Sequence, residues 1–427
     1  MKMLTFLFSL LVLTLIGCSD RVSEMVTYKI NEPVFMSSKA FRNSVKVTSE
    51  PKQIEVLGKM CFYEGYLYIS EPEKGIHIID NRTPANPKII GFIKLLGNAD
   101  LSIRNGLLYA DSFVDLVWFD ITNPEIPALK GRLEKIFTTS LPVIENGYSF
   151  DYSKAFNEDS TGIVVGWELK ERTEEVNKYT GGWYWGWGRP EVFASMDGVA
   201  LNSTKTGGSN GITGSMSRFT IYDGNLYTVI NNAMTIFILD GAQPTKAAEN
   251  IYIGGNVETI FSYEDNMFMG TPTGLLIYSV TDPLKPTFQS SISHVFGCDP
   301  VVVENDIAYV TVHSGNLCGQ NTNELIIINV SNVKKPKHIV SYAMTNPKGL
   351  GIDDTKLFLC DDGLKIYTVG DPQTLLSNRL AHFTNIDGFD VIPYNNTLMM
   401  IAEDGLYQYN YSNLNDIRQI SKIAIGK

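Results

Sequence analysis

Five charged residues stand where apolar runs of the sequence begin, and the carboxylates of the four acids among them could hold a cation. The five residues are Asp100, Arg218, Glu258, Asp299 and Asp390. If these runs lie side by side around a common centre, the carboxylates converge, which shifts their pKa values or recruits a cation, and oxygen ligands suit Ca²⁺. We therefore expect a cation or polar-ligand site here, with His313 beside it. The alternative is that the acids cap turns or hold water.

Catalytic motifs are missing from the sequence. It has no glycine-rich phosphate loop, His-Glu-x-x-His zinc helix or Gly-x-Ser-x-Gly nucleophile turn. His77 stands in an apolar run and is interpreted as a core residue. Two acids flanking a sugar could still do acid–base work, so a lyase or hydrolase of sugars is the enzyme alternative. We favour a non-catalytic binding scaffold, because repeats place acids at one mouth without any catalytic need.

An aromatic segment offers a second candidate binding surface. Residues 181–188 read Gly-Gly-Trp-Tyr-Trp-Gly-Trp-Gly, with rings at Trp183, Trp185 and Trp187. Exposed tryptophans would suit a sugar or a protein partner. Alternatively, these rings cover a small core of their own.

The repeats define the elements that position these residues. Apolar runs open at Gly75, Asp115, Thr235, Gly274, Glu324, Gly363 and Gly405, and a turn follows nine residues later, at Pro84, Pro124, Pro244, Pro283, Val333, Pro372 and Leu414. A second β-run precedes each opener, a third lies upstream of that, and a fourth follows the turn. Four short antiparallel strands per unit are typical of a β-propeller blade, and the apolar run suits a strand buried on both faces.

We expect an all-β fold of seven four-stranded blades. Residues 138–215 are read as an insertion after the second repeat, although an eighth blade could lie there. The first strand of each blade should line the ring axis. The starts of the first strands and the hairpins between second and third strands should then share one side of the ring.

The turn sequence carries a family resemblance. Ile76-His-Ile-Ile-Asp-Asn, followed by Pro84-Ala-Asn-Pro87, resembles the LVIVD repeat, a β-propeller repeat of exported bacterial and archaeal proteins. The resemblance covers residues 56–137 and 216–427. It implies a propeller and an exported location, and it implies no catalytic residue.

The N-terminus predicts export. Lys2 precedes an apolar stretch that ends at Gly17-Cys18, which is too short to span a membrane and reads as a signal peptide over residues 1–17. Gly17-Cys18 resembles the lipobox of bacterial lipoproteins, which implies a lipid on Cys18. Residues 18–50 are then a tether and extension, whose β-runs at 28–36 and 44–49 could pair with the last C-terminal strand. Residues 51–427 form the propeller.

The other cysteines allow one pairing prediction. Cys298 begins a first strand and Cys318 lies in the second-to-third hairpin of the same unit, so both fall on one side of the ring. Because exported proteins meet oxidising conditions, we predict a Cys298–Cys318 disulfide. Cys61 and Cys360 fall in different units and are expected to be free and buried.

The net charge of the chain excludes some classes of binding partner. The formal net charge is −11 and the chain has no run of Lys or Arg, so neither nucleic acid nor anionic lipid is favoured electrostatically. We expect a lipid-anchored protein of the bacterial cell envelope, at the outer membrane, that binds a glycan, peptide or partner protein.

Overall fold

The computed structural model describes residues 25–144, 147–150, 155, 161–175, 210–213, 215, 217–230, 232–241, 243–293, 300–313 and 322–426. The elements of these residues are strands, apart from the short helix α2 (Ser38–Arg42) and the 3₁₀ helix η2 (Pro372–Asn378). The predicted all-β class is confirmed.

Seven sheets share one antiparallel meander of four consecutive strands. Sheet 1 contains β3 (Met60–Tyr63), β4 (Tyr66–Glu71), β5 (Gly75–Asp80) and β6 (Lys88–Lys94); sheet 2 contains β7 (Leu101–Arg104), β8 (Leu107–Ser112), β9 (Asp115–Asp120) and β10 (Ala128–Leu133). Sheet 3 contains β14 (Phe219–Tyr222), β15 (Asn225–Ile230), β16 (Ala233–Ile238) and β17 (Thr245–Tyr252); sheet 4 contains β18 (Thr259–Tyr263), β19 (Asn266–Thr271), β20 (Gly274–Ser279) and β21 (Thr287–Ser293).

The C-terminal half repeats the pattern. Sheet 5 contains β22 (Val301–Glu304), β23 (Ile307–Val312), β24 (Glu324–Asn329) and β25 (Lys337–Ala343). Sheet 6 contains β26 (Leu350–Asp353), β27 (Lys356–Cys360), β28 (Leu364–Thr368) and β29 (Arg379–Phe383); sheet 7 contains β30 (Gly388–Tyr394), β31 (Thr397–Ala402), β32 (Gly405–Asn410) and β33 (Arg418–Ala424). In six sheets, the residue predicted to open the apolar run lies within one position of the first residue of the third strand. In sheet 3 the third strand begins two residues before the predicted Thr235.

The third strands are buried because their apolar runs lie between neighbouring sheets. In β5 and β32 the first five residues are buried, and only the last is partly exposed. In sheets 1, 2, 4, 5 and 7 the last residue of the third strand is an Asp, Asn or Ser whose side chain accepts the amide two residues on, as Asp120 does from Thr122 and Asn410 does from Ser412. These local turns aim the chain toward the fourth strand.

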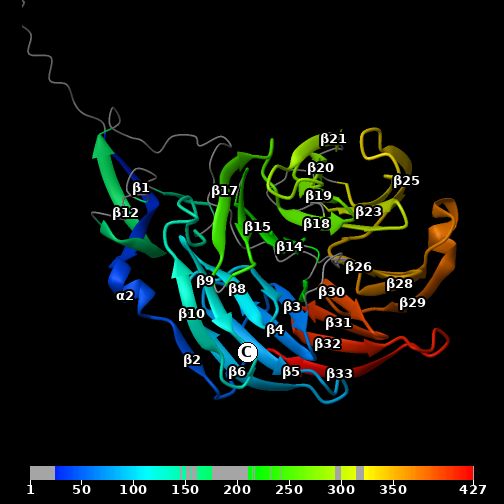
Figure 1. Ribbon diagram of the computed structural model, residues 1–427, viewed down its shortest axis with the longest axis horizontal. Coiled ribbons are helices and arrows are strands. Elements are labelled where there is room, and N and C mark those ends of the chain that lie inside the picture. Colours follow the sequence, from blue (N-terminus) through cyan, green and yellow to red (C-terminus); the bar gives the residue numbers. More distant parts are fainter. Residues whose placement is uncertain are drawn as a thin grey trace, which may run out of the picture.

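The sheets form a ring with the first strands on the inside (Figure 1). β3 contacts β7, β7 contacts β14, and the same relation continues through β18, β22, β26 and β30. An apolar cluster fills each joint; between sheets 2 and 3 it includes Tyr109, Trp118, Phe219 and Phe237. Sheet 2 therefore packs directly on sheet 3, with no further sheet between them.

Side-chain packing closes the ring between sheets 7 and 1. Ile54, Phe62 and Leu67 share a cluster with Ile392 and Leu406, which come from the other end of the chain. Ser421 on β33 donates to the carbonyl of Pro84 (2.7 Å), and Ser290 on β21 donates in the same way to the carbonyl of Val333 in sheet 5. The closing joint thus repeats the geometry of an internal joint.

The closing joint also contains a buried amide pair. Asn81 Nδ2 donates to Gln408 Oε1 (3.0 Å), and Gln408 Nε2 donates to Asn81 Oδ1 (2.7 Å). Both side chains are almost fully buried. Each amide therefore satisfies the other inside an apolar joint.

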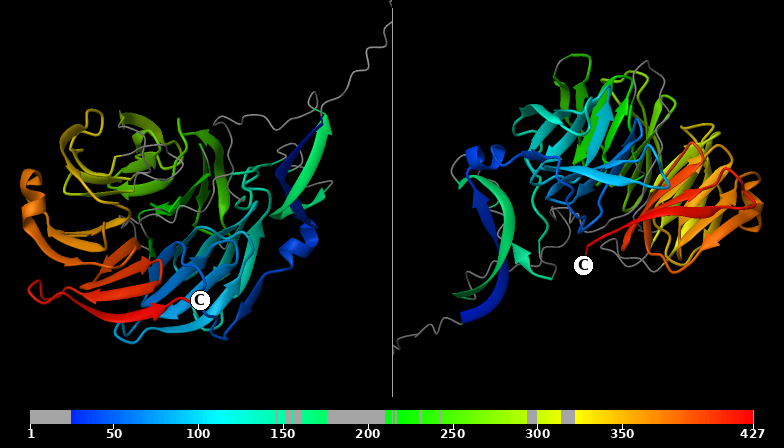
Figure 2. Two further views of the ribbon diagram at one scale, coloured as in Figure 1. Left: turned by 180° about the vertical axis from the view of Figure 1, so that it is seen from behind. Right: turned by 90° about the horizontal axis from the view of Figure 1, so that it is seen from below.

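The N-terminal strands pair differently from the expectation. β1 (Met25–Met36) pairs with β12 (Ile163–Glu175) and with β11 (Ser149–Phe150), and β2 (Lys46–Thr48) pairs with the outer strand β6. The predicted pairing with the last C-terminal strand is wrong, because sheet 7 already takes its four strands from one meander. Figure 2 shows the β1–β12 sheet standing beside the ring.

Residues 138–215 add strands to other sheets. Their described strands are β11, β12 and β13 (Ile212–Thr213), and these join β1 and β3 without forming a meander of their own.

Candidate functional site

The predicted pore-mouth residues lie where first strands begin, with cations between the acids. Lys59, Asp100 and Arg218 stand just before β3, β7 and β14, and the backbone carbonyl of each accepts an amide from the second strand of its own sheet. Glu258 stands just before β18 and is partly buried. Signs therefore alternate through sheets 1 to 4. The expected group of converging carboxylates stays a prediction, with Lys59 and Arg218 as opposite charges near Asp100. Lys59 was not predicted because it belongs to no motif of the repeat.

Asp100 joins sheets 2 and 3. Its carboxylate accepts hydrogen bonds from Ser217 Oγ (2.7 Å) and from the backbone amide of Arg218 (2.6 Å), both in the next sheet. The amide of Leu101 supplies another (2.9 Å). Complete burial raises the pKa of Asp100, although the charges of Lys59 and Arg218 oppose this. Its hydrogen bonds give Asp100 the structural role that the sequence left open as an alternative.

Asp111, on β8, is a buried acid at the hairpin between the second and third strands of sheet 2. Its Oδ1 accepts the amides of Ala99 (2.7 Å) and Asp100 (2.9 Å) and the side-chain amide of Asn98 (3.1 Å). Its Oδ2 is buried and has no hydrogen-bond partner in the part of the chain that the structure describes. Burial raises the pKa of Asp111 to about 7, and the neighbouring charge of Asp100 adds to the effect. The only sequence signal is its place in the hairpin before Asp115.

The other predicted ligand residues do not assemble into a metal site. Asp390, on β30, and His313, after β23, are both buried, and Asp299 lies outside the described residues. In the part of the chain that the structure describes, no group of three or more His, Cys, Asp or Glu residues could hold a metal ion. The described members of the predicted Ca²⁺ set, Asp100, Glu258 and Asp390, thus form no such group.

Several predicted residues fall where the structure makes no statement. They are Cys18, Trp183, Trp185, Trp187, Cys298 and Cys318. The lipid site, the aromatic surface and the disulfide therefore stay predictions. Cys61 and Cys360 are buried thiols outside any disulfide, as expected.

A short strand of the chain occupies the inner edge of sheet 1. β13 pairs antiparallel with β3, with Ile212 opposite Phe62 and Thr213 opposite Cys61. Because β3 is the innermost strand of its sheet, β13 lies toward the ring axis. The space at the ring axis is therefore narrower than it would be if the seven first strands alone enclosed it.

Ion pairs mark the hairpins of three consecutive sheets, 6, 7 and 1. We name these residues the ion-pair face: Glu71, Lys74, Asp361, Lys365, Asp404 and Lys422. Lys74 pairs with Glu71 (3.0 Å), Lys365 with Asp361 (2.6 Å) and Lys422 with Asp404 (2.6 Å). The hairpins lie on one side of the ring because the sheets share one meander.

Glu71 is the most enclosed acid of the ion-pair face. It accepts hydrogen bonds from His77 Nε2 (2.6 Å) and Lys52 Nζ (2.9 Å). Burial favours its neutral form, but the bonds from His77, Lys52 and Lys74 outweigh burial and lower the pKa of Glu71 to about 2. His77 is fully buried, as expected of a core residue. In sheets 2, 4 and 5 the counterparts of His77 are apolar: Val117, Leu276 and Ile326.

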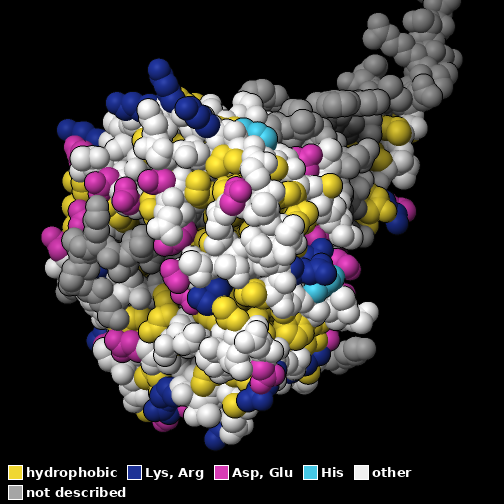
Figure 3. All heavy atoms as spheres, turned by 90° about the vertical axis from the view of Figure 1, so that its right-hand side faces the viewer, with side chains coloured by type: hydrophobic (Ala, Val, Ile, Leu, Met, Phe, Trp, Pro, Cys, Tyr) yellow, Lys and Arg dark blue, Asp and Glu magenta, His cyan; other side chains and the backbone are white. Residues whose placement is uncertain are grey.

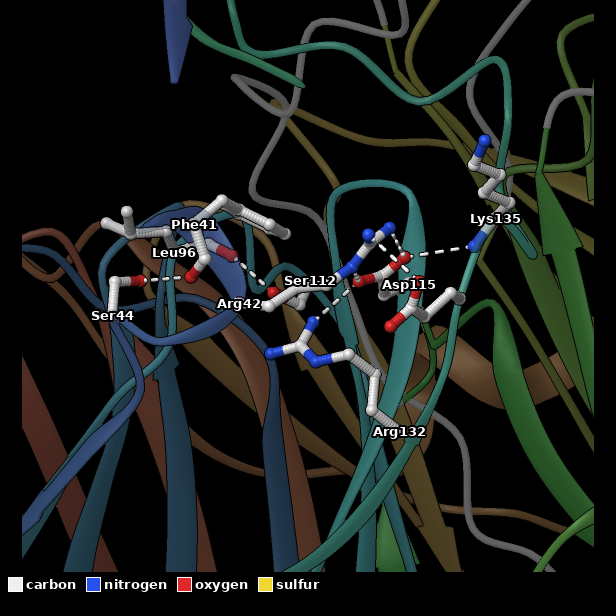
Figure 4. A network of polar contacts seen from close by, with 9 residues as sticks. Phe41, Arg42, Ser44, Leu96, Ser112, Asp115, Arg132 and Lys135 are labelled. Atoms are coloured by element: carbon white, nitrogen blue, oxygen red, sulfur yellow. Dashed lines mark hydrogen bonds and ion pairs between the residues drawn. The ribbon is translucent and has the colours of Figure 1, made fainter. Parts of the chain in front are cut away.

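A separate network fixes the N-terminal extension to sheet 2 (Figure 4). Arg42 of α2 and Arg132 of β10 both reach the buried carboxylate of Asp115, at 2.9 Å and 2.8 Å. The backbone amide of Lys135 donates to the same carboxylate (3.0 Å). Both carboxylate oxygens of Asp115 thus accept two hydrogen bonds each, which join α2 and β10 to β9 and leave no lone pair for a ligand.

None of the helices in the described residues is long and apolar enough to cross a bilayer.

The fold defines the class of the protein, which is a repeat β-propeller. Residues 60–93 match the family model of the LVIVD repeat. The match begins with β3 and ends one residue before the end of β6, so it covers nearly all of the four-strand meander of sheet 1. The predicted repeat family is confirmed on this sheet. Among curated proteins, no significant relative was found.

Solved structures of similar shape have distant sequences. A Bacteroides fragilis protein named "putative 6-phosphogluconolactonase (BF1038)" has a TM-score of 0.49 and 10% identity, covering 88% of this chain and 97% of that one. Kluyveromyces lactis Hsv2p has a TM-score of 0.47 and 10% identity, covering 86% and 99%. The computationally designed Ika8 protein has a TM-score of 0.47 and 8% identity, covering 88% and 91%. At these values the likeness transfers no activity.

Proposed function

We propose that this protein is an exported, lipid-anchored β-propeller that acts as a non-catalytic scaffold and binds a partner protein on its ion-pair face. One observation carries the proposal: charged side chains of both signs gather on the hairpins of three consecutive sheets. Lys74 and Asp404 are about half exposed there. Such groups can exchange their internal ion pairs for pairs with a partner.

The alternating signs favour a protein over an uncharged glycan. Interleaved positive and negative groups select a surface with the complementary pattern, and they govern specificity and association rate more than affinity. On the side of the ring seen in Figure 3, Lys and Arg side chains lie among Asp and Glu, with no broad area of one sign. This mixture fits a protein partner better than a polyanion.

The acids at the ring axis support a scaffold over an enzyme. Asp100 is occupied by hydrogen bonds that join two sheets, and Asp111 is fully buried. A general acid must reach its substrate within hydrogen-bond distance. The sugar lyase or hydrolase alternative would therefore need acids other than these two. A glycan array read for both binding and bond cleavage tests it, and cleavage would overturn the scaffold proposal.

Charge reversal tests the binding surface. The double variant Lys74→Glu/Lys422→Glu changes two partly exposed lysines of the ion-pair face, and Lys334→Glu/Lys335→Glu is the matched control on the turn at the other end of sheet 5. Partners captured from native membranes by the wild type are identified, and their affinity is then measured with purified components. We expect the first variant to weaken binding at least about tenfold, with weaker salt dependence, and the control to bind normally. Equal binding by both variants would contradict the proposal.

A further inference from the structure

The inner edge of sheet 1 carries a strand that comes from a distant part of the sequence. β13 lies near the end of the insertion and runs antiparallel to β3, so its chain direction leads from the end of β3 back to its start. Asn210 forms a bridge with Arg104 at the end of β7. Residues 210–213 therefore lie along the inner sides of both sheet 1 and sheet 2.

Specific contacts hold this segment. The amide of Gly211 donates to the carbonyl of Ile103 (2.7 Å), and Arg104 Nη1 donates to Asn210 Oδ1 (2.8 Å). Backbone groups from two sheets are thus satisfied by one short strand. This is how an extended peptide is bound when it adds to a sheet edge.

The contact with sheet 1 requires glycine at position 211. A Cβ atom there would lie 2.4 Å from Cys61 Sγ and 3.0 Å from Ile103 Cβ. Cys61 is fully buried and Ile103 belongs to the same apolar cluster, so neither can give way freely. The edge therefore accepts a strand only where a glycine faces Cys61.

The segment is held weakly compared with the sheets around it. β13 and β3 share two residue pairs, whereas there are four pairs between β3 and β4 and six between β4 and β5. Ser215, just beyond β13, is buried, and its hydroxyl has no hydrogen-bond partner among the described residues. A segment with few pairs and an unsatisfied polar group opens at a lower free energy than the whole ring.

We propose that the inner edge of β3, together with Ile103 and Arg104, is a binding site for an extended peptide strand, which the chain fills with its own residues 210–213. Recognition comes from backbone pairing, from a glycine against Cys61 and from an acceptor for Arg104. The ligand class is thus an extended peptide with a hydrogen-bond acceptor directly before a glycine.

Cys61 reports whether the edge is occupied. The double variant Asn210→Ala/Gly211→Val should displace the segment, and Gly166→Val is the matched control because a Cβ at Gly166 has no atom within 4 Å. Thiol labelling of the full chain is followed at Cys61 by peptide mass spectrometry. Cys360, buried between sheets 6 and 7, serves as the reference for global unfolding. Asn210→Ala alone serves as a milder variant if the double variant does not fold.

We expect Cys61 to react at least about tenfold faster in the displaced variant, with Cys360 unchanged, which corresponds to about 1.4 kcal/mol of lost protection. A synthetic peptide with the sequence of residues 208–216 should then restore protection, and the same peptide carrying Gly211→Val should not. Equal labelling of Cys61 in the variant and the control, or no protection by the native peptide, would overturn the proposal.

Discussion

Two joints of the ring share one geometry but differ in their interior. At the joint between sheets 4 and 5, Ile277 and Val330 lie in one apolar cluster. At the closing joint, the same repeat positions hold Gln408 and Asn81, whose amides bond each other. Ser290 and Ser421 occupy equivalent places in the two joints. The two joints therefore differ chiefly in whether the buried pair is apolar or polar.

The apolar pair contributes mainly to the stability of its joint, whereas the amide pair contributes mainly to the choice of the neighbouring sheet. An apolar pair stabilises a joint but would fit any neighbouring sheet, because all sheets present similar apolar faces. A buried amide is satisfied only by a matching amide, so Asn81 favours sheet 7 over every other neighbour. The polar pair stands where the two ends of the propeller meet, which is the one joint that chain connectivity does not enforce.

Truncation in the apolar joint should give the largest effect. Ile277→Ala removes a fully buried side chain and leaves a cavity, which should lower the free energy of unfolding by about 2–5 kcal/mol. Chemical denaturation measures it. Leu284→Ala, in the turn between β20 and β21, is the control, since Leu284 is exposed and its truncation should change stability little. Equal losses in the two variants would argue against a packed joint.

Asp111 and Asp361 offer a matched contrast between an unpaired and a paired acid. Each accepts two consecutive backbone amides, but Asp361 also pairs with Lys365, whereas Asp111 Oδ2 has no hydrogen bond within the described part of the chain. The pKa of Asp111 is raised from 3.8 to about 7, so the folded state holds a proton that the unfolded chain has lost. The contribution of protonated Asp111 to the free energy of unfolding is therefore fully present below about pH 4. It is lost as the pH rises to about 7, which lowers the free energy of unfolding by up to roughly 4 kcal/mol.

The variant Asp111→Asn should abolish this fall, because an amide keeps the acceptor oxygen and has no proton to lose. Asp361→Asn should instead destabilise the protein at neutral pH, since it leaves Lys365 without its carboxylate. Thermal unfolding between pH 4 and 8 distinguishes the two variants. A wild-type stability that does not change over this range would contradict the role given to Asp111.

The serine contacts should give the smallest effect. Ser421→Ala and Ser290→Ala each remove one donor to a turn carbonyl, and each should cost about 1 kcal/mol. Similar losses would support the equivalence of the closing and the internal joint. A loss at Ser290 alone, in denaturation experiments run in parallel, would mean that sheets 7 and 1 do not pack as sheets 4 and 5 do.

Local patterns in the sequence predicted the repeats, the strands and the burial of third strands such as β5, because these depend on residues a few positions apart. Long-range pairings could not be predicted. β13 pairs only Ile212 and Thr213 with residues about 150 positions away, and so short a contact leaves no periodicity. Lys59 at the ring axis was not predicted for a similar reason, since it lies in a loop without a motif. Asn81 could have been noticed as a polar residue where other repeats carry Ile121 or Val280.

A double-mutant cycle on Asn81 and Gln408 tests ring closure most directly. Asn81→Val and Gln408→Ile install the residues of the joint between sheets 4 and 5, and each alone leaves a buried amide unsatisfied, at a cost of about 1–3 kcal/mol. The double variant should regain most of the loss, so the coupling free energy should be at least about 1 kcal/mol. Single losses that simply add would mean that the two residues do not meet, and the ring would not be closed as described.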